Sequence, residues 1–139
     1  MNRKRVVLIG ILAIGVIVVG GAAAYEFVIK PMDSGPPSAA QLAAWQYSVP
    51  KITTNLQDNG IIEMQVTLQA PSAAVAAELS DRAAQVEDAV IAVLHGLSGQ
   101  QIMQPGGRHL VKLLVLKRIN SFLTSGKVTE VYIDSLIVQ

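Results

Sequence analysis

The chain has 139 residues, enough for one small domain and a membrane anchor. Only 15% of these residues are charged, against about a quarter in an average soluble domain, and the mean hydropathy is +0.44. The absence of cysteine excludes disulfides and thiol chemistry, and a net charge of +1 provides no basic footprint for a nucleic-acid partner.

An apolar segment without any charged side chain covers residues Val6–Tyr25. A helix of this length spans about 30 Å, the thickness of the hydrocarbon core of a bilayer. Within lipid, a helix satisfies its own backbone hydrogen bonds. We therefore predict a transmembrane helix over residues 6–29. Gly10, Ala13 and Gly20 are small residues through which a partner helix could approach it closely.

Charge indicates how this helix is oriented. Residues 3–5 are all basic, whereas Glu26 and Lys30 after the apolar segment cancel. The positive-inside rule then places residues 1–5 in the cytoplasm and the remainder outside. A cleaved signal peptide is the alternative, with residues 22–24 as small residues for a peptidase, but the long apolar run favours an uncleaved anchor.

A linker is predicted over residues 30–44, because residues 31–40 read PMDSGPPSAA and such Pro- and Ser-rich segments rarely form elements. It separates the anchor from a domain over residues 45–139 on the outer side of the membrane. Residues 31–139 carry seven basic and nine acidic side chains, so the basic surplus of the chain belongs to the anchor and indicates topology.

Two strands are predicted at the start of this domain. Residues 46–56 are rich in Tyr, Val, Ile and Thr, and Pro50 within them indicates an edge position or a bulge. Residues 58–60 (Asp-Asn-Gly) are a turn signal. Residues 61–69 then alternate apolar and polar, which is typical of a half-buried strand. Together these segments predict a β-hairpin.

Two helices follow. Ser72 is a suitable N-cap for a helix that runs to about His95, and a loop is expected from Gly99 to Gly107. The second helix is predicted over residues 108–123, with Gly126 ending it. Its apolar arc is wide, so it is either buried on more than one side or in contact with a partner.

The last strand is predicted over residues 128–138. Strict alternation places Val131, Ile133 and Ile137 on one face. It places Tyr132, Leu136 and Val138 on the other. Both faces are then largely apolar, which favours a central strand or one covered by another chain. The order strand, strand, helix, helix, strand predicts an α+β domain with helices on one face of a small sheet.

No residue set indicates catalysis or a cofactor. His95 and His109 are the only histidines and lack neighbouring ligands at metal-site spacing. The Gly-Gly-Arg sequence at 106–108 lacks the spacing of a phosphate-binding loop and is interpreted as a turn before a helix. The basic residues of the second helix are interpreted as a solvated face. We predict no metal, no cofactor and no enzymatic activity.

Four segments together carry a resemblance to a known family: residues 128–139, Asn55-Leu56, Gly107-Arg108 with the helix that follows, and residues 85–97. They resemble the FliL family of flagellar basal-body proteins. Residues 128–139 are similar to the closing pattern of that family, Val-x-x-Val-Tyr-Phe-Thr-x-Phe-Val-Val-Gln. Ile133-Asp134 replaces the usual Phe-Thr, and Leu136 replaces a common Phe.

The resemblance implies a non-enzymatic scaffold of the bacterial inner membrane, whose periplasmic, stomatin/SPFH-like domain over residues 45–139 assembles into a homo-oligomeric ring. The implied partners are flagellar stator proteins, the MS ring of the basal body and inner-membrane lipids, and the implied role is support of torque and swarming. Expected contact residues are Arg108, Lys112, Arg118, Tyr132 and Asp134. The alternatives are a membrane-anchored, stomatin-like scaffold or binding module outside the flagellum, and an anchored enzyme.

Overall fold

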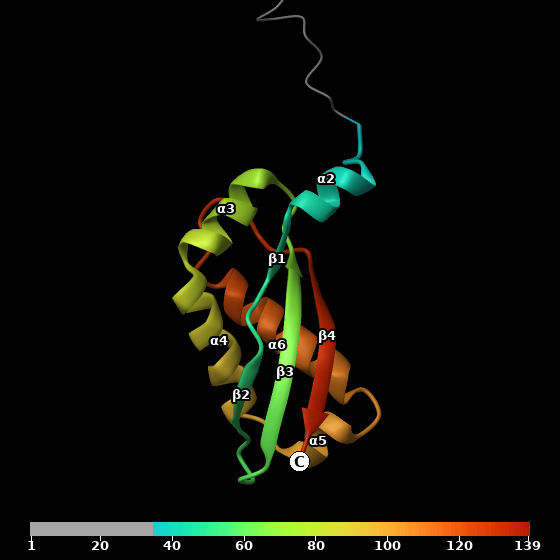
Figure 1. Cartoon of the computed structure of the whole chain (residues 1–139), viewed down its shortest axis with the longest axis vertical. Helices are drawn as coiled ribbons and strands as arrows, with labels where there is room; N and C mark the ends of the chain where they lie inside the picture. The colour runs from blue at the N-terminus through green and yellow to red at the C-terminus, as the bar shows by residue number, and fades with distance from the viewer. Residues whose placement is uncertain (1–34) are drawn as a thin grey trace, which may run out of the picture. The chain divides into compact units, whose positions relative to one another are not determined.

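A computed structural model describes residues 35–139, of which residues 37–139 form one compact unit. Figure 1 shows a sheet with α4 and α6 packed against one of its faces. The predicted α+β class is therefore confirmed. The elements are α2 (Ala39–Ala44), β1 (Gln46–Ser48), β2 (Ile52–Asn55), β3 (Ile61–Gln69), α3 (Ala73–Asp81), α4 (Ala83–His95), α5 (Gly99–Met103), α6 (Gly107–Asn120) and β4 (Glu130–Val138).

The predicted N-terminal segments, residues 1–5 and 6–29, lie outside the described residues, as do the packing positions Gly10, Ala13 and Gly20. Among residues 35–139, no helix combines the length and the apolarity needed to cross a bilayer.

The C-terminal part of the predicted linker 30–44 forms the short helix α2. Ser38 begins it with a capping box, in which its hydroxyl and the Gln41 side chain each accept a backbone N–H. Gln69 Nε2 donates a hydrogen bond to the Leu42 carbonyl at 2.9 Å. Residues 39–44 are therefore attached to the domain.

The sheet is antiparallel throughout, with β3 at its centre. Leu68 of β3 pairs with Tyr47 of β1 on one side and with Val131 of β4 on the other. β1 and β2 share one edge of the sheet, and β4 forms the other. Of the two alternatives predicted for the last strand, the central position is wrong, because within residues 35–139 β4 pairs only with β3, and coverage by another chain stays a prediction.

A β-bulge explains why β4 is apolar on both sides of its alternating pattern. Gln65 pairs with Ser135, but the next residue of β3, Val66, pairs with Ile133, so Asp134 is an extra residue. The alternation changes face at this point, and the predicted facing of β4 is corrected accordingly. Four residues face the helices, opposite Leu68, Val66, Met64 and Ile62 in turn: Val131, Ile133, Leu136 and Val138.

The hairpin prediction is confirmed. Pro50, which has no N–H, interrupts the first predicted strand between β1 and β2 at an edge of the sheet. At the turn, the Leu56 N–H donates to the Gly60 carbonyl at 2.7 Å. Asn59 adopts a φ of 64°, in the left-handed region that asparagine tolerates better than most residues.

The prediction of one helix over residues 72–95 is wrong, because α3 and α4 meet at Arg82, whose ψ of 25° lies outside the helical region. Ser72 does cap α3, as predicted. Near the end of α3, the Glu78 carboxylate accepts the backbone N–H groups of residues 124–125. We attribute the break to this attachment, since α4 packs instead against α6.

The predicted loop over residues 99–107 contains α5, whose N-cap Ser98 forms a capping box with Gln101. Helix α6 ends at Asn120, earlier than predicted, and Gly126 does not terminate it. The Asn120 side chain accepts the Val128 N–H at 2.8 Å and donates to the Val128 carbonyl at 3.0 Å. These two bonds turn the chain toward β4.

The core lies between the sheet and the helices. On β3 the apolar residues at every second position from Ile62 to Leu68 are buried, and Thr67 and Gln69 of the other face are buried as well. On α6 every fourth residue is buried, close to the period of a helix. The largest fully buried side chains are Ile62, Met64, Leu68, Leu79, Leu94 and Ile119.

Candidate functional site

Helix α6 carries more apolar surface than the domain covers. Val111, Val115 and Ile119 form its buried row. Leu113, on another side, is 53% exposed, and Leu114 is half-buried. From the sequence, the wide apolar arc of this helix could be buried on more than one side or could contact a partner. Within residues 35–139 nothing covers the side of α6 that carries Leu113. A hollow lies on each side of this helix.

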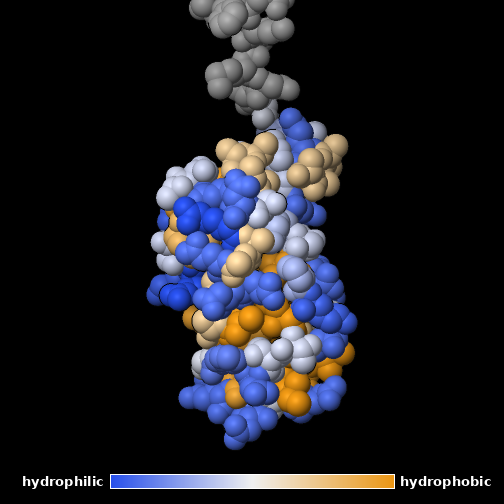
Figure 2. Space-filling view, turned by 60° about the vertical axis from the view of Figure 1, so that its left-hand side comes forward, coloured by the Kyte–Doolittle hydropathy of each residue, from blue (hydrophilic) through white to orange (hydrophobic). Residues whose placement is uncertain are grey.

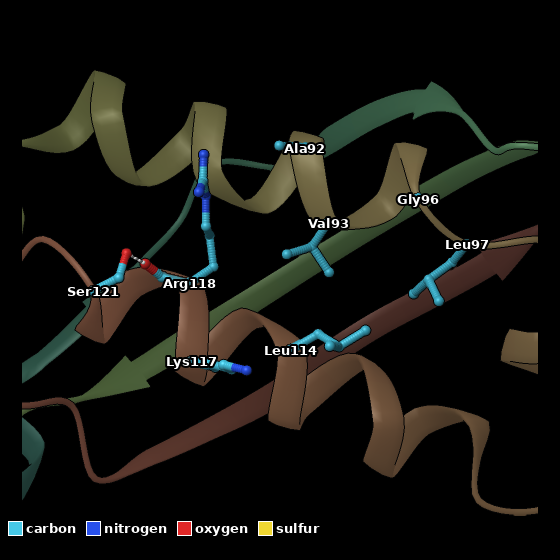
Figure 3. A pocket seen from close by; sticks show the side chains of 8 residues that line it. All are labelled: Ala92, Val93, Gly96, Leu97, Leu114, Lys117, Arg118 and Ser121. Atoms are coloured by element: carbon cyan, nitrogen blue, oxygen red, sulfur yellow. Dashed lines mark hydrogen bonds between the residues drawn. The ribbon is translucent and has the colours of Figure 1, made fainter.

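The α4–α6 groove is the more apolar hollow, with a volume of about 390 Å³. Val93 and Leu114 project into it from opposite helices, with Leu97 toward one end and Arg118 toward the other (Figure 3). Lys117 also lines it. Figure 2 shows hydrophobic side chains gathered among polar ones on the side of the domain that carries α4. An apolar floor with two cations suits an apolar anchor flanked by acidic groups.

The α6–β4 cleft lies on the other side of α6 and has a volume of about 430 Å³. Arg108, His109 and Lys112 line it from α6, and Tyr132 and Ile133 line it from β4. Lys112 Nζ lies 5.9 Å from the centroid of the Tyr132 ring, within the range of a cation–π interaction. Cations beside a 41%-exposed aromatic ring are typical of protein interfaces.

A tight turn at Gly106 and Gly107 leads into α6 and to Arg108, the first cation of this cleft. Gly106 has a φ of 84°, which favours glycine. A Cβ on Gly107 would lie 2.2 Å from the Ile102 carbonyl oxygen, so only glycine allows α6 to begin this close to α5. The geometry agrees with the interpretation of residues 106–108 as a turn before a helix.

The five expected contact residues do not form one surface. The α6–β4 cleft brings Arg108, Lys112 and Tyr132 together, whereas Arg118 lines the α4–α6 groove. Asp134 lies in the bulge of β4, and its carboxylate accepts a hydrogen bond from Thr67 Oγ1 at 2.8 Å. Because Thr67 belongs to the polar side of β3, Asp134 stands on the sheet face opposite the helices.

Glu78 is the most perturbed acid of the described residues, and sequence reasoning missed it. The pKa of Glu78 is lowered from 4.5 to about 2, chiefly by the backbone N–H of Ser125, with burial opposing and Thr124 adding to the effect. Arg82 Nε lies 3.0 Å from its carboxylate. The i, i+4 spacing of Glu78 and Arg82 predicts an ion pair on one helix face, but it does not reveal the hydrogen bonds that Glu78 accepts from residues 124–125. The role of Glu78 is structural.

The described residues contain no arrangement for chemistry. No group of three or more His, Asp or Glu side chains in residues 35–139 could hold a metal ion. His95 Nε2 lies 2.7 Å from Thr54 Oγ1, which ties the end of α4 to β2. The α4–α6 groove and the α6–β4 cleft are open hollows beside one helix, and such a surface is suited to binding another protein.

Comparisons with known proteins agree on one family. A sequence profile described as "Flagellar basal body-associated protein FliL" matches residues 46–139. The chain is 37% identical over 122 residues to a "Flagellar protein FliL" of Bacillus subtilis (strain 168), with 86% of each chain covered. It is 33% identical over 76 residues to a protein of the same name from Aquifex aeolicus (strain VF5), covering 55% of this chain and 47% of that protein.

Proposed function

Because the chain belongs to the FliL family of flagellar basal body-associated proteins, we propose that it is a scaffold of the flagellar motor that assembles around stator units and supports torque and swarming. Membership makes it a flagellar accessory protein of a family that is not an enzyme family. The stator, the MS ring and membrane lipids are the proposed partners.

One observation carries this proposal. The family match covers β1 to the last residue, and this same domain leaves apolar and cationic surface open on both sides of α6. Exposed apolar surface next to polar groups is typical of proteins that assemble with others. The absence of a catalytic set in residues 35–139 is compatible with a mechanical role.

The proposed mechanism has two parts. The predicted anchor over residues 6–29 holds the chain in the inner membrane, with the N-terminus in the cytoplasm and the domain in the periplasm. Copies of the domain then form a closed ring that surrounds the periplasmic part of a stator unit. Such a ring stabilises the extended, active form of the stator, because it binds that form and not the compact one.

A deletion strain tests this function. We expect the strain to lose swarming and to show reduced torque per stator unit, measured from the stepwise speed increments of a bead on one flagellum. The full chain should restore both, whereas a matched control chain that lacks residues 37–139 should restore neither. Normal torque and normal swarming in the deletion strain would contradict the proposal and favour a membrane-anchored scaffold outside the flagellum.

A further inference from the structure

We propose that copies of the chain meet head to tail, with an acidic surface of one copy seated in the α6–β4 cleft of the next. The acidic surface consists of Asp81 at the end of α3 and Glu87 and Asp88 on α4. This inference rests on the proposed function, because it names the two surfaces that meet within the ring.

The acidic surface carries charges that the domain itself does not neutralise. Within residues 35–139, Asp81, Glu87 and Asp88 form no salt bridge and no side-chain hydrogen bond. Asp88 shares a small hollow with Arg118, but the two do not reach salt-bridge distance. Other acids are engaged, as Glu63 is with Lys51 at 2.9 Å. The three carboxylates of the acidic surface are therefore available to a cationic partner.

The α6–β4 cleft offers the complementary charge. Arg108 is exposed and makes no side-chain bond within residues 35–139. Lys112 lies 3.9 Å from Glu130, at the outer limit of a salt bridge. Leu113 and Tyr132 add exposed apolar area beside these cations. Exposed charge pairs each contribute little, so they set the orientation of a contact whose area comes from such apolar groups.

The two surfaces lie on opposite sides of the domain. Figure 1 shows α4 on the left, and the beginning of α6 beside β4 on the right. A symmetric contact of either surface with its own copy would place like charges together, which is repulsive. A contact between the two different surfaces pairs opposite charges, and a contact of that heterologous kind generates rings or filaments.

Cysteine cross-linking of the full chain in its native membrane tests the geometry, because the chain has no cysteine of its own. Two differently tagged chains are co-expressed, one with Ala84→Cys on α4 and one with His109→Cys in the cleft. Both positions are exposed. We expect disulfide-linked heterodimers under mild oxidation. Only homodimers of either variant, or monomer alone, would overturn the inference.

Charge reversal in the cysteine-bearing chains tests the chemistry. In the chain with His109→Cys, Arg108→Glu with Lys112→Glu should lower the heterodimer yield about tenfold, which corresponds to about 1.4 kcal/mol. Asp81→Lys with Glu87→Lys in the chain with Ala84→Cys should restore the yield, because the cross-link joins the acidic surface of that chain to the cleft of the other. The matched control, Lys51→Glu with Lys127→Glu in the chain with His109→Cys, makes the same charge change at residues of neither surface and should leave the yield unchanged, since the Lys51–Glu63 pair that it breaks is exposed. Within residues 35–139 the Arg108 side chain makes no bond, so a lower yield for Arg108→Glu alone reports the lost charge and not misfolding.

Two outcomes separate this inference from the proposed function. If the deletion strain has a motility defect but charge reversal in the cleft leaves cross-linking intact, the chain is a motor scaffold and the inference is wrong. If cross-linking follows the charges but the deletion strain moves normally, the contact is real and the flagellar role fails. Loss of cross-linking that the reciprocal reversal does not restore would also count against head-to-tail contact.

Discussion

Deletion of Asp134 is expected to leave β4 in register, whereas deletion of Tyr132 is expected to shift it. Because Asp134 is the extra residue of the bulge, its removal produces a strand that alternates regularly, with Leu136 and Val138 still facing the core. The bond to Thr67 is lost, but Thr67 keeps the Ser48 hydroxyl at 3.1 Å. We expect a loss of about 1–2 kcal/mol in the free energy of unfolding.

Deletion of Tyr132 instead shifts the part of the chain that precedes it by one residue, so its side chains move to the other face of the sheet. Val131, 1% exposed, and Val128, 3% exposed, would leave the core. Full burial of a valine contributes at least about 1.5 kcal/mol, so we expect a loss of roughly 3 kcal/mol or more. With a urea m-value of about 1–3 kcal/mol per molar, the two deletions should differ by about 1 M in midpoint.

Urea unfolding of residues 37–139 measures both deletions, and Tyr132→Ala serves as the control for loss of the side chain alone. Tyr132 is 41% exposed and its ring lies beside Lys112, so this substitution should lower the unfolding free energy by about 0.5–1 kcal/mol, well below the loss expected from the deletion. Equal losses for the two deletions would refute the assignment of Asp134 as the bulge residue, and with it the corrected facing of β4.

Three further predictions concern stability. Val115→Ala should lower the unfolding free energy by about 2 kcal/mol because Val115 is fully buried, whereas Leu113→Ser should change it by about 0.5 kcal/mol or less; similar urea midpoints would contradict the facing of α6. Gly106→Ala should lower the unfolding free energy by roughly 1–2 kcal/mol, because only its positive φ is unfavourable for alanine. Gly107→Ala should lower it by much more, because the Cβ of the new alanine would collide with backbone atoms, and thermal unfolding of both variants checks this order. The pKa of Glu78 is depressed in the folded state, so its stabilising effect is complete above pH 4.5 and is lost as the pH falls to about 2; Glu78→Gln should flatten acid unfolding in this window, and an unchanged profile would contradict the role of Glu78.

Local patterns predicted those elements whose own residues determine them. The alternation over residues 61–69, the Asp-Asn-Gly turn and the Ser72 cap each follow from short-range chemistry, and the structure confirms them. The break at Arg82 could not be predicted, because we attribute it to bonds between Glu78 and residues 124–125, far along the chain. The bulge at Asp134 likewise depends on the register with β3.

The candidate surfaces were only partly predictable. Arg108, Lys112 and Tyr132 were named as contacts, and the structure brings them into one cleft, although the helix and the strand that carry them are separated in sequence. The α4–α6 groove was missed, because Val93 and Leu114 occupy apolar positions that a helical period assigns to the core. Sequence alone cannot distinguish an apolar residue that is covered from one that is left open.

The predicted anchor bears on which assembly a head-to-tail contact produces. Repeating one heterologous contact generates a ring when the rotation between neighbours closes, and a helical filament when each step also rises along the axis. Copies that the predicted anchor over residues 6–29 holds in one bilayer could not rise along the membrane normal, so such an anchor would remove the filament as an outcome. In the proposed contact, the separation of the acidic surface from the α6–β4 cleft would set the direction, and the membrane would restrict it to a plane. A chain without the anchor should therefore keep the pairwise Ala84→Cys and His109→Cys cross-link but lose the closed ring, which electron microscopy of the two forms would distinguish.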